Sequence, residues 1–397
     1  MRGGSDGEAC HRSAGAGRFL LLASFPDSIP TFRGELIRAL VASGFDVHVA
    51  APGLSTHSAA MAFLSACGCT AHDVPLERNG TNPVADLRLV FALLVLVRRL
   101  QPEVMLAYTI KPVVYGVIAG WLACVPRRFA LVTGLGYAFT EGRAGPLTQL
   151  IRRLYGFALT RTHGVFFQNP DDEALFRSLG LLPEAVPSWV VNGSGVDTAQ
   201  FAPASLPIGA PAFLMIGRLL GDKGVREYAA AARQLGGEFP DARFQLVGWI
   251  DSNPDAITQG ELDAWVADGT LDFLGRLADV RPAIAACTVY VLPSYREGTP
   301  RTVLEAMAMG RPIITTDAPG CRETVIDGDN GFLVPVQSVD ALVDAMLKFI
   351  EDPALAPRMG RRSRQIAEDK YDVHKVNAVM LREMGITRAA TEGEAQA

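Results

Sequence analysis

Short apolar runs alternate along the chain with longer segments in which apolar residues recur every three or four positions. The runs have the length of buried strands, and the longer segments have the period of helices that cover a sheet. In the first half, the pattern predicts strands at 18–24, 46–50, 104–107, 128–132 and 164–168, and helices at 32–43, 83–101, 113–123 and 147–162. Strands and helices at this spacing indicate right-handed parallel units.

The same alternation starts again in the second half, after a loop-like stretch from Asn192 to Pro211. Strands are expected at 212–216, 243–247, 271–274, 289–292 and 313–316, with helices between them, a long helix near 339–351 and a last one near 373–385. We therefore expect an α/β protein with two doubly wound, Rossmann-like domains whose strand ends face a central crevice.

Length and composition agree with two globular domains. A chain of 397 residues is too long for one ordinary core. We divide it into domains at 18–200 and 201–385, with flexible tails at 1–17 and 386–397. The first tail contains no apolar stretch and is not expected to be a signal peptide. No uncharged run reaches the roughly 18 residues that a bilayer-spanning helix needs.

Charge and cysteine content narrow the class further. The formal charge is −5 at pH 7, about +2 for residues 1–200 and about −7 for the remainder, and this small asymmetry argues against nucleic-acid binding. The six cysteines are scattered, and Cys67 and Cys69 are too close together for a typical structural metal pair. We expect reduced, buried thiols in a cytoplasmic protein.

The segment from Val289 to Asp317 carries the clearest chemistry, in the order strand, loop, helix, strand. Thr299-Pro300 has the residues of a helix start, with a hydroxyl for the N-cap and proline for the first turn. Glu297 precedes this start and Glu305 follows it. Their spacing also arises by chance, but the loop leaves the carboxyl end of a strand, where parallel sheets bind anions. Two carboxylates beside such a site indicate recognition of sugar or ribose hydroxyls.

A second segment supplies the positive charge that such a site requires. Gly217-Arg218 ends a predicted strand, and Lys223 follows just before a helix. An arginine fork and a lysine together can neutralise a diphosphate, and Gly217 lets the backbone approach closely. Gly275 and Arg276, which also follow a predicted strand, can offer groups to a nucleotide base.

These motifs resemble the retaining glycosyltransferases of family 4, which have the GT-B fold. The resemblance rests on Gly217-Arg218, Lys223-Gly224 and the run from Glu297 to Glu305, and it extends from residue 18 to about residue 385. It implies that Arg218, Lys223 and Glu297 are the catalytic residues. Arg218 and Lys223 would bind the diphosphate of a UDP-sugar, and Glu297 would contact hydroxyls of the sugar. The donor-binding residues that it implies, with Glu305 on the ribose, are Gly217, Arg218, Lys223, Gly275, Arg276, Glu297, Gly298, Thr299, Thr302 and Glu305.

Fixed cations and helix-end amides can stabilise a departing nucleotide diphosphate, so we expect no metal or other cofactor. Asp327-Gly-Asp329 has the form of a metal motif, but its context indicates a hairpin turn. Many family members carry a histidine where this chain has Thr133-Gly134. Because that histidine is replaced, we expect front-face transfer assisted by the leaving phosphate, without a side-chain base.

The acceptor is expected in the first domain, where Tyr108, Lys111, Gly134 and Gly136 follow two predicted strands. These segments resemble the subgroup of N,N′-diacetylbacillosaminyl-diphospho-undecaprenol N-acetylgalactosaminyltransferases of bacterial glycoprotein assembly. The resemblance implies an undecaprenyl-diphosphate-linked saccharide as acceptor, with Lys111 on its phosphate. A purely structural role for Lys111 remains open.

A lipid-linked acceptor implies contact with a membrane surface. The segment 142–170 has no acidic residue, and Arg152, Arg153 and Arg161 are interleaved with apolar side chains. This composition suits an interfacial helix on an anionic leaflet, and a domain helix with solvated arginines is the open alternative. We expect a peripheral protein on the cytoplasmic face of the bacterial inner membrane.

The sequence thus predicts a hexosyltransferase of bacterial polysaccharide or glycoprotein glycan assembly. It would move a hexose or N-acetylhexosamine from a UDP-sugar to a lipid-linked saccharide with retention of configuration. Two alternatives remain open. One is a non-hydrolysing UDP-sugar epimerase, which the run from Glu297 to Glu305 disfavours. The other is a non-catalytic partner that binds nucleotide sugar or glycolipid, which the complete set of Arg218, Lys223, Glu297 and Glu305 disfavours.

Overall fold

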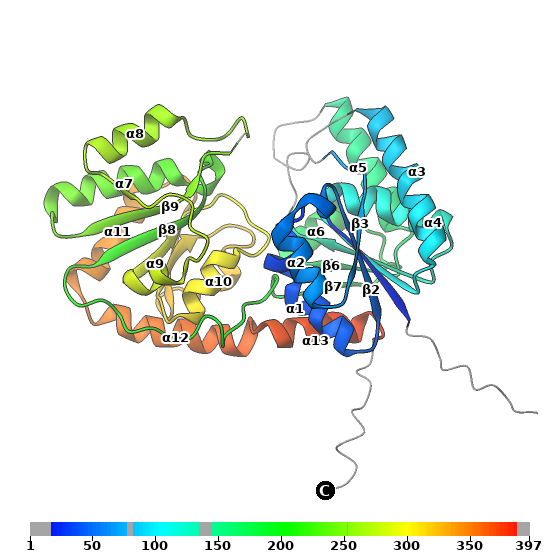
Figure 1. Cartoon of the computed structure of the whole chain (residues 1–397). Helices are drawn as coiled ribbons and strands as arrows, with labels where there is room; N and C mark the ends of the chain where they lie inside the picture. Colours follow the sequence, from blue (N-terminus) through cyan, green and yellow to red (C-terminus); the bar gives the residue numbers. More distant parts are fainter. Residues whose placement is uncertain (1–16, 78–81, 135–144, 252, 387–397) are drawn as a thin grey trace, which may run out of the picture.

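The computed structural model describes residues 17–77, 82–134, 145–251 and 253–386. In these ranges the chain forms two parallel β-sheets, each covered by helices, which stand beside one another (Figure 1). This architecture confirms the predicted fold class, an α/β protein with two doubly wound Rossmann-like domains.

The first sheet has the strand order β3-β2-β1-β4-β5-β6-β7, and every neighbouring pair is parallel. Its strands are β1 (Arg18–Leu22), β2 (Asp46–Ala51), β3 (Thr70–Asp73), β4 (Val104–Tyr108), β5 (Arg127–Val132), β6 (Gly164–Phe167) and β7 (Ser188–Val190). The helices that accompany it are α1 (Ser28–Ala42), η1 (Leu54–Thr56), α2 (Ser58–Ala66), α3 (Pro83–Leu100), η2 (Pro112–Gly116), α4 (Val117–Leu122), α5 (Pro146–Leu159) and α6 (Pro170–Ser178).

The second sheet has the strand order β10-β9-β8-β11-β12-β13 and is also parallel throughout. Its strands are β8 (Ala212–Arg218), β9 (Arg243–Trp249), β10 (Asp272–Phe273), β11 (Val289–Leu292), β12 (Ile313–Thr316) and β13 (Gly331–Val334). Its helices are η4 (Gly221–Lys223), α7 (Val225–Glu238), α8 (Gln259–Ala267), α9 (Arg281–Ala286), α10 (Arg301–Ala308), η5 (Arg322–Thr324), α11 (Val339–Glu351) and α12 (Leu355–Lys370).

The apolar strands of the first sheet are buried on both sides because this sheet has a core on each face. In β1, Phe19 and Leu21 belong to one cluster, and Leu20 and Leu22 belong to another. Successive side chains of a strand point to opposite faces, so a strand covered on both faces must be apolar throughout. This is why the sequence shows continuous apolar runs instead of alternation.

Each sheet has one place where its strand order reverses, between β1 and β4 in the first and between β8 and β11 in the second. Ligands of doubly wound sheets bind beyond the carboxyl ends of the strands at this switch point. The two switch points therefore define where the functional side chains are expected.

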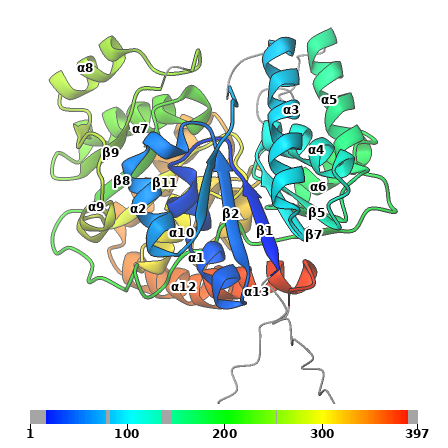
Figure 2. The ribbon, with the colours of Figure 1, turned by 45° about the vertical axis from the view of Figure 1, so that its right-hand side comes forward.

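The last helix, α13 (Val373–Glu383), does not stay with the second domain (Figures 1 and 2). It packs against α1, and Val376 and Met380 join the core cluster on that face of the first sheet. The sequence-based domain at 201–385 therefore does not describe α13, which is an apolar-faced helix completing the other domain. This helix packs the C-terminal part of the described chain against the N-terminal domain.

Candidate active site

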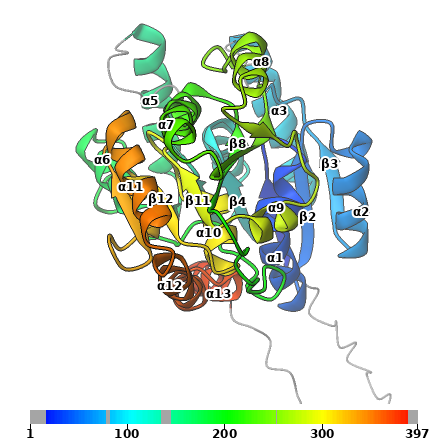
Figure 3. The ribbon, with the colours of Figure 1, turned by 90° about the vertical axis from the view of Figure 1, so that its left-hand side faces the viewer.

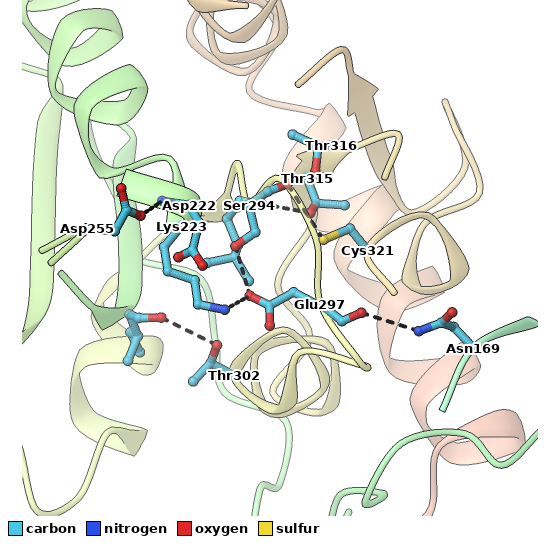
Figure 4. A network of polar contacts seen from close by, with 12 residues as sticks. Asn169, Asp222, Lys223, Asp255, Ser294, Glu297, Thr302, Thr315, Thr316 and Cys321 are labelled. Atoms are coloured by element: carbon cyan, nitrogen blue, oxygen red, sulfur yellow. Dashed lines mark hydrogen bonds and ion pairs between the residues drawn. The ribbon is translucent and has the colours of Figure 1, made fainter. Parts of the chain in front are cut away.

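A lysine from one strand end and a glutamate from the next meet at the second switch point. Lys223 Nζ lies 2.5 Å from Glu297 Oε1, and both side chains are mostly buried. The Ser294 hydroxyl lies 2.9 Å from the same carboxylate oxygen (Figure 4). The structure thus brings together a cation and a carboxylate that are 74 positions apart in the chain.

The two loops that carry this pair are locked to each other through their backbones. Gly224 has a φ of 73°, and a Cβ there would lie 2.2 Å from the carbonyl oxygen of Pro293. Tyr295 N donates to Asp222 O at 2.9 Å. Only glycine allows this approach, so Gly224 fixes where Lys223 stands relative to Glu297.

Arg218 ends β8 and pairs with a carboxylate from the loop that follows the neighbouring strand β9. Its Nη1 lies 3.0 Å from Asp251 Oδ2, and its side chain is about one-third exposed. Gly217, one residue earlier, pairs in register with Gly248 of β9. The arginine fork is thus held at the strand end and still reachable from solvent.

Gly275 and Arg276 lie beside the same strand end. Gly275 O accepts a hydrogen bond of 2.9 Å from Gly248 N. The guanidinium of Arg276 lies 4.6 Å from the ring centroid of Trp249, as a cation–π pair. This edge of the site therefore combines an exposed ring, a guanidinium and backbone groups.

Glu305 is buried on α10 and is 6% exposed. Burial raises the pKa of its carboxyl, and the ion pair with Arg301, at 2.7 Å, opposes that rise. Thr302, on the same helix, directs its hydroxyl to Ile216 O at 3.5 Å (Figure 4). Glu297 and Glu305 consequently have different partners, a lysine and an arginine.

The loop before α10 is anchored on the first domain. Thr299 does not cap α10 as predicted, because Pro300 holds the N-cap position and the Thr299 hydroxyl donates to Gln168 O at 2.9 Å. Asn169 Nδ2 donates to Gly298 O at 2.9 Å. A Cβ on Gly298 would lie 2.4 Å from Gln168 Oε1, so this loop and the first domain are in close contact.

The predicted acceptor residues differ in their burial and in their hydrogen-bond partners. Tyr108 is buried with its hydroxyl 2.8 Å from that of Ser28. Lys111 pairs with Asp86 at 2.8 Å, which neutralises its charge within the domain. Gly134 follows β5 with a φ of 138°, and Gly136 lies outside the described residues.

The three arginines predicted to contact membrane have different surroundings. Arg153 is exposed on α5, and Arg152 is half-buried. Arg161 follows the helix and lies over the rings of Phe157, at 3.8 Å, and Trp121, at 5.1 Å. Only Arg153 is therefore presented openly on the helix itself.

The Asp327-Gly-Asp329 segment is a turn, but not a hairpin. Asp327 Oδ1 accepts from Leu333 N at 2.9 Å, and Asp329 pairs with Arg362 at 2.7 Å. The turn leads into β13, which runs parallel to β12. The cysteine prediction was also only partly right, since Cys287 and Cys321 are buried whereas Cys124 is exposed and Cys67 and Cys69 are half-buried.

The sequence reasoning missed the partners that hold the site. Asp251 holds Arg218, Ser294 holds Glu297, and Asn169 holds the loop of Gly298. Each lies within about two residues of the carboxyl end of a strand. That position was the available signal, and Asn169-Pro170 also has the form of a helix start.

Two doubly wound domains with a cationic site at facing strand ends define the GT-B class of enzymes. Residues 210–352 match the family model of glycosyl transferases group 1, and residues 29–189 match that of the glycosyl transferase 4-like domain. The chain therefore belongs to the GT-B glycosyltransferases of family 4, and it is a glycosyltransferase.

Two relatives cover most of the chain. It is 29% identical to the N,N′-diacetylbacillosaminyl-diphospho-undecaprenol α-1,3-N-acetylgalactosaminyltransferase of Campylobacter jejuni, over 73% of this chain and 79% of that protein. It is 26% identical to the UDP-Gal:α-D-GlcNAc-diphosphoundecaprenol α-1,3-galactosyltransferase of Escherichia coli, over 71% of this chain and 75% of that protein.

Solved structures show the same fold. Sucrose-phosphate synthase of Thermosynechococcus elongatus superposes with a TM-score of 0.75 at 20% identity, covering 92% of this chain and 98% of that one. HepE of Anabaena, in complex with UDP and glucose, superposes with a TM-score of 0.73 at 20% identity, covering 94% of this chain and 100% of that one.

Proposed function

We propose that this glycosyltransferase takes a hexose or N-acetylhexosamine from a UDP-sugar and transfers it to a saccharide linked to undecaprenyl diphosphate. The pair of Lys223 and Glu297 at the second switch point carries this proposal. It places a cation for a phosphate and a carboxylate for a hydroxyl where doubly wound sheets bind nucleotides. The names of the two relatives support the donor and the acceptor.

The proposed mechanism starts from the ion pairs of the site, in which carboxylates hold the cations that the donor needs. The diphosphate takes the place of the carboxylates beside Arg218 and Lys223, and these cations stabilise the charge that leaves with UDP. Glu297, released from Lys223, accepts hydrogen bonds from hydroxyls of the sugar. Glu305 accepts from the ribose. The acceptor attacks from the face that UDP leaves, so the anomeric configuration is retained.

Membrane contact is proposed at a corner of the first domain, where α3 and α5 lie together (Figures 1 and 2). Four residues of α3 at helical spacing form an exposed apolar stripe, namely Val84, Leu87, Phe91 and Val95. Arg88 and Arg98 flank it and are exposed. An apolar stripe with a basic border fits the surface of an anionic bilayer.

The neighbouring helix α5 has the same character. Leu150, Arg153 and Phe157 share one face by their spacing, and all three are exposed. Among the described residues, no helix is both long and apolar enough to cross a bilayer. We therefore propose that the protein lies on the membrane at the level of the lipid headgroups.

Vesicle pelleting tests the membrane contact. We expect binding to vesicles that contain anionic phospholipid and little binding to neutral ones. Phe91→Glu together with Arg153→Glu should abolish it, whereas substitution of the exposed Lys348 of α11, Lys348→Ala, should not. Wild-type pelleting of the double variant would refute this surface as the contact.

A panel of UDP-sugars, assayed with and without a short polyprenyl-diphosphate saccharide, tests the function. We expect sugar transfer from at least one donor only when the acceptor is present. Conversion of UDP-sugar without acceptor would instead indicate the epimerase. Binding without either reaction would indicate a non-catalytic partner.

A further inference from the structure

Arg33 of α1 is a buried cation that has no hydrogen-bonded or ionic partner within the described ranges. It is 2% exposed, and its Nε faces no acceptor there. Its guanidinium lies 5.3 Å from the ring centroid of Tyr108, a cation–π contact. Burial lowers the pKa of Arg33 to about 10, so the side chain is still protonated at neutral pH.

Arg33 stands at the switch point of the first sheet. It lies on α1, the helix that follows β1, and the ring that it covers belongs to the last residue of β4. Thr109, the next residue, has a φ of 69° and a buried hydroxyl without a partner in the described ranges. Two unsatisfied polar side chains therefore flank Tyr108 where a doubly wound sheet binds its ligand.

This place faces the donor half of the molecule. The guanidinium of Arg301 lies 5.6 Å from the ring centroid of Phe32, the residue before Arg33. Figures 1 and 3 both draw α1 beside α10. Arg301 is already paired with Glu305, and its positive charge also lowers the pKa of Arg33. No carboxylate of the described residues forms an ion pair with Arg33.

A buried charge without acceptors is costly, because the hydration that it loses is not replaced. Tyr108 supplies part of the missing stabilisation through its ring, and the hydrogen bond to Ser28 holds that ring in place. An incoming anion would supply the remaining acceptors. A guanidinium presents a planar fork that matches two phosphate oxygens.

We propose that Arg33 binds a phosphate of a diphosphate-bearing substrate at the switch point of the first domain, with Tyr108 as the residue that positions it. The ligand class rests on the proposed function, which brings two diphosphates to the crevice, that of the UDP-sugar and that of the lipid-linked acceptor. Both present the same oxyanion, and a binding experiment separates them.

The test is calorimetric titration of the full-length protein with UDP and, separately, with farnesyl diphosphate. Arg33→Met removes the fork and keeps most of the volume, and Arg38→Met is the control on the exposed side of the same helix. We expect Arg33→Met to weaken one of the two ligands by roughly tenfold or more, since a charged hydrogen bond is lost. A lower affinity for UDP assigns Arg33 to the donor, and a lower affinity for farnesyl diphosphate assigns it to the acceptor. Unchanged affinity for both overturns the proposal.

Thermal unfolding separates binding from a structural role. Removing an unpaired buried charge should leave the melting temperature of Arg33→Met unchanged or higher. A lower melting temperature with unchanged affinities would overturn the proposal. Arg33→Lys keeps the charge but not the planar fork, and it replaces Arg33→Met in the titrations if that variant does not fold. Wild-type affinity of Arg33→Lys for both ligands would equally refute the site. Wild-type protein that binds a diphosphate through Arg33 but transfers no sugar would contradict the proposed function alone.

Discussion

At the scale of residues, three cations of the second domain are already paired with carboxylates. Lys223 pairs with Glu297, Arg218 with Asp251, and Arg301 with Glu305. Pairs of this kind hold the side chains in position before substrate arrives, and in the proposed mechanism the diphosphate of the donor then displaces the carboxylates from Lys223 and Arg218. A substitution of one member also leaves its partner without a counter-charge.

Lys223→Ala should lower kcat by about a hundredfold, because it removes stabilisation of the charge on the departing diphosphate. Steady-state kinetics with the active UDP-sugar measure this. Lys348→Ala serves as the control. A rise in KM with unchanged kcat would show that Lys223 binds substrate without acting on the transition state.

The sequence predicted that Lys223 and Glu297 come together at one edge of the sheet, but not the partners that hold the charged side chains. Lys223, Glu297 and Glu305 stand in short local motifs, and each motif follows a buried strand that the apolar pattern reveals. Arg33 could not be found in this way. What distinguishes Arg33 is that it is buried without a hydrogen-bond partner in the described ranges. That property depends on how distant segments of the chain pack around it.

At the scale of elements, a capping box stabilises α8 and links it to α7. Glu261 accepts from Thr258 N at 2.7 Å, and Arg226 of α7 pairs with it at 2.7 Å. The bond from Arg226, followed by that from Thr258, lowers the pKa of Glu261 to about 2. The folded state therefore favours the ionised carboxylate more than the unfolded state does.

This shift predicts a pH dependence of stability. Because the folded pKa lies below the unfolded one, the contribution of Glu261 is present above about pH 4.5 and is lost as pH falls toward 2. The side chain is partly solvated, so we expect a contribution of about 1 kcal/mol or less. Urea unfolding across this range should show a smaller acid loss in Glu261→Gln than in wild type. Identical pH profiles would contradict the prediction.

The loop before α10 should not tolerate a side chain at position 298. In Gly298→Ala the new Cβ would lie 2.4 Å from Gln168 Oε1 and 2.6 Å from Thr133 O, so the loop must move away from the first domain. We expect kcat/KM to fall by roughly tenfold to a hundredfold, because Glu297 moves with the loop. Gly237→Ala, where a Cβ has no neighbour within 4 Å, is the control. Wild-type activity in Gly298→Ala would contradict the tight contact.

Local patterns predicted the fully buried strands well and the partly exposed edge strand poorly. The strand at 289–292 and the helix at 339–351 were predicted with the observed bounds. The edge strand β3 was missed because its four residues include polar side chains and are not fully buried. The predicted helix-capping role of Thr299 was wrong because its hydroxyl donates to Gln168 of the other domain.

At the scale of the whole molecule, α13 joins the two halves. The helix follows the second domain in the chain and buries Met380 in the core of the first. Met380→Ala should lower the free energy of unfolding of the first domain by about 2–5 kcal/mol, since the side chain is fully buried. Hydrogen exchange should show faster exchange in α1 and β1.

Lys375→Ala, on the exposed side of α13, is the control for that experiment. Unchanged exchange of α1 in Met380→Ala would show that the helix contributes little to the first domain. Faster exchange in both variants would indicate that α13 is only loosely attached.

The two domains also meet through charges. Arg322 pairs with Asp171 at 2.9 Å, and Arg296 pairs with buried Asp172. Arg296 directly precedes Glu297, so the contact between the domains and the candidate site involve the same segment. The sequence predicted two domains and a crevice, but not which side chains cross it, because such contacts have no local pattern.

Titration of UDP into the purified protein tests the central claim most directly, namely that the crevice at the second switch point holds the nucleotide of the donor. The account predicts that wild-type protein binds UDP and that Lys223→Ala binds it roughly tenfold or more weakly. Lys348→Ala should bind as wild type does. Equal UDP affinity in wild type and Lys223→Ala, or no binding of UDP by the wild type, would contradict it.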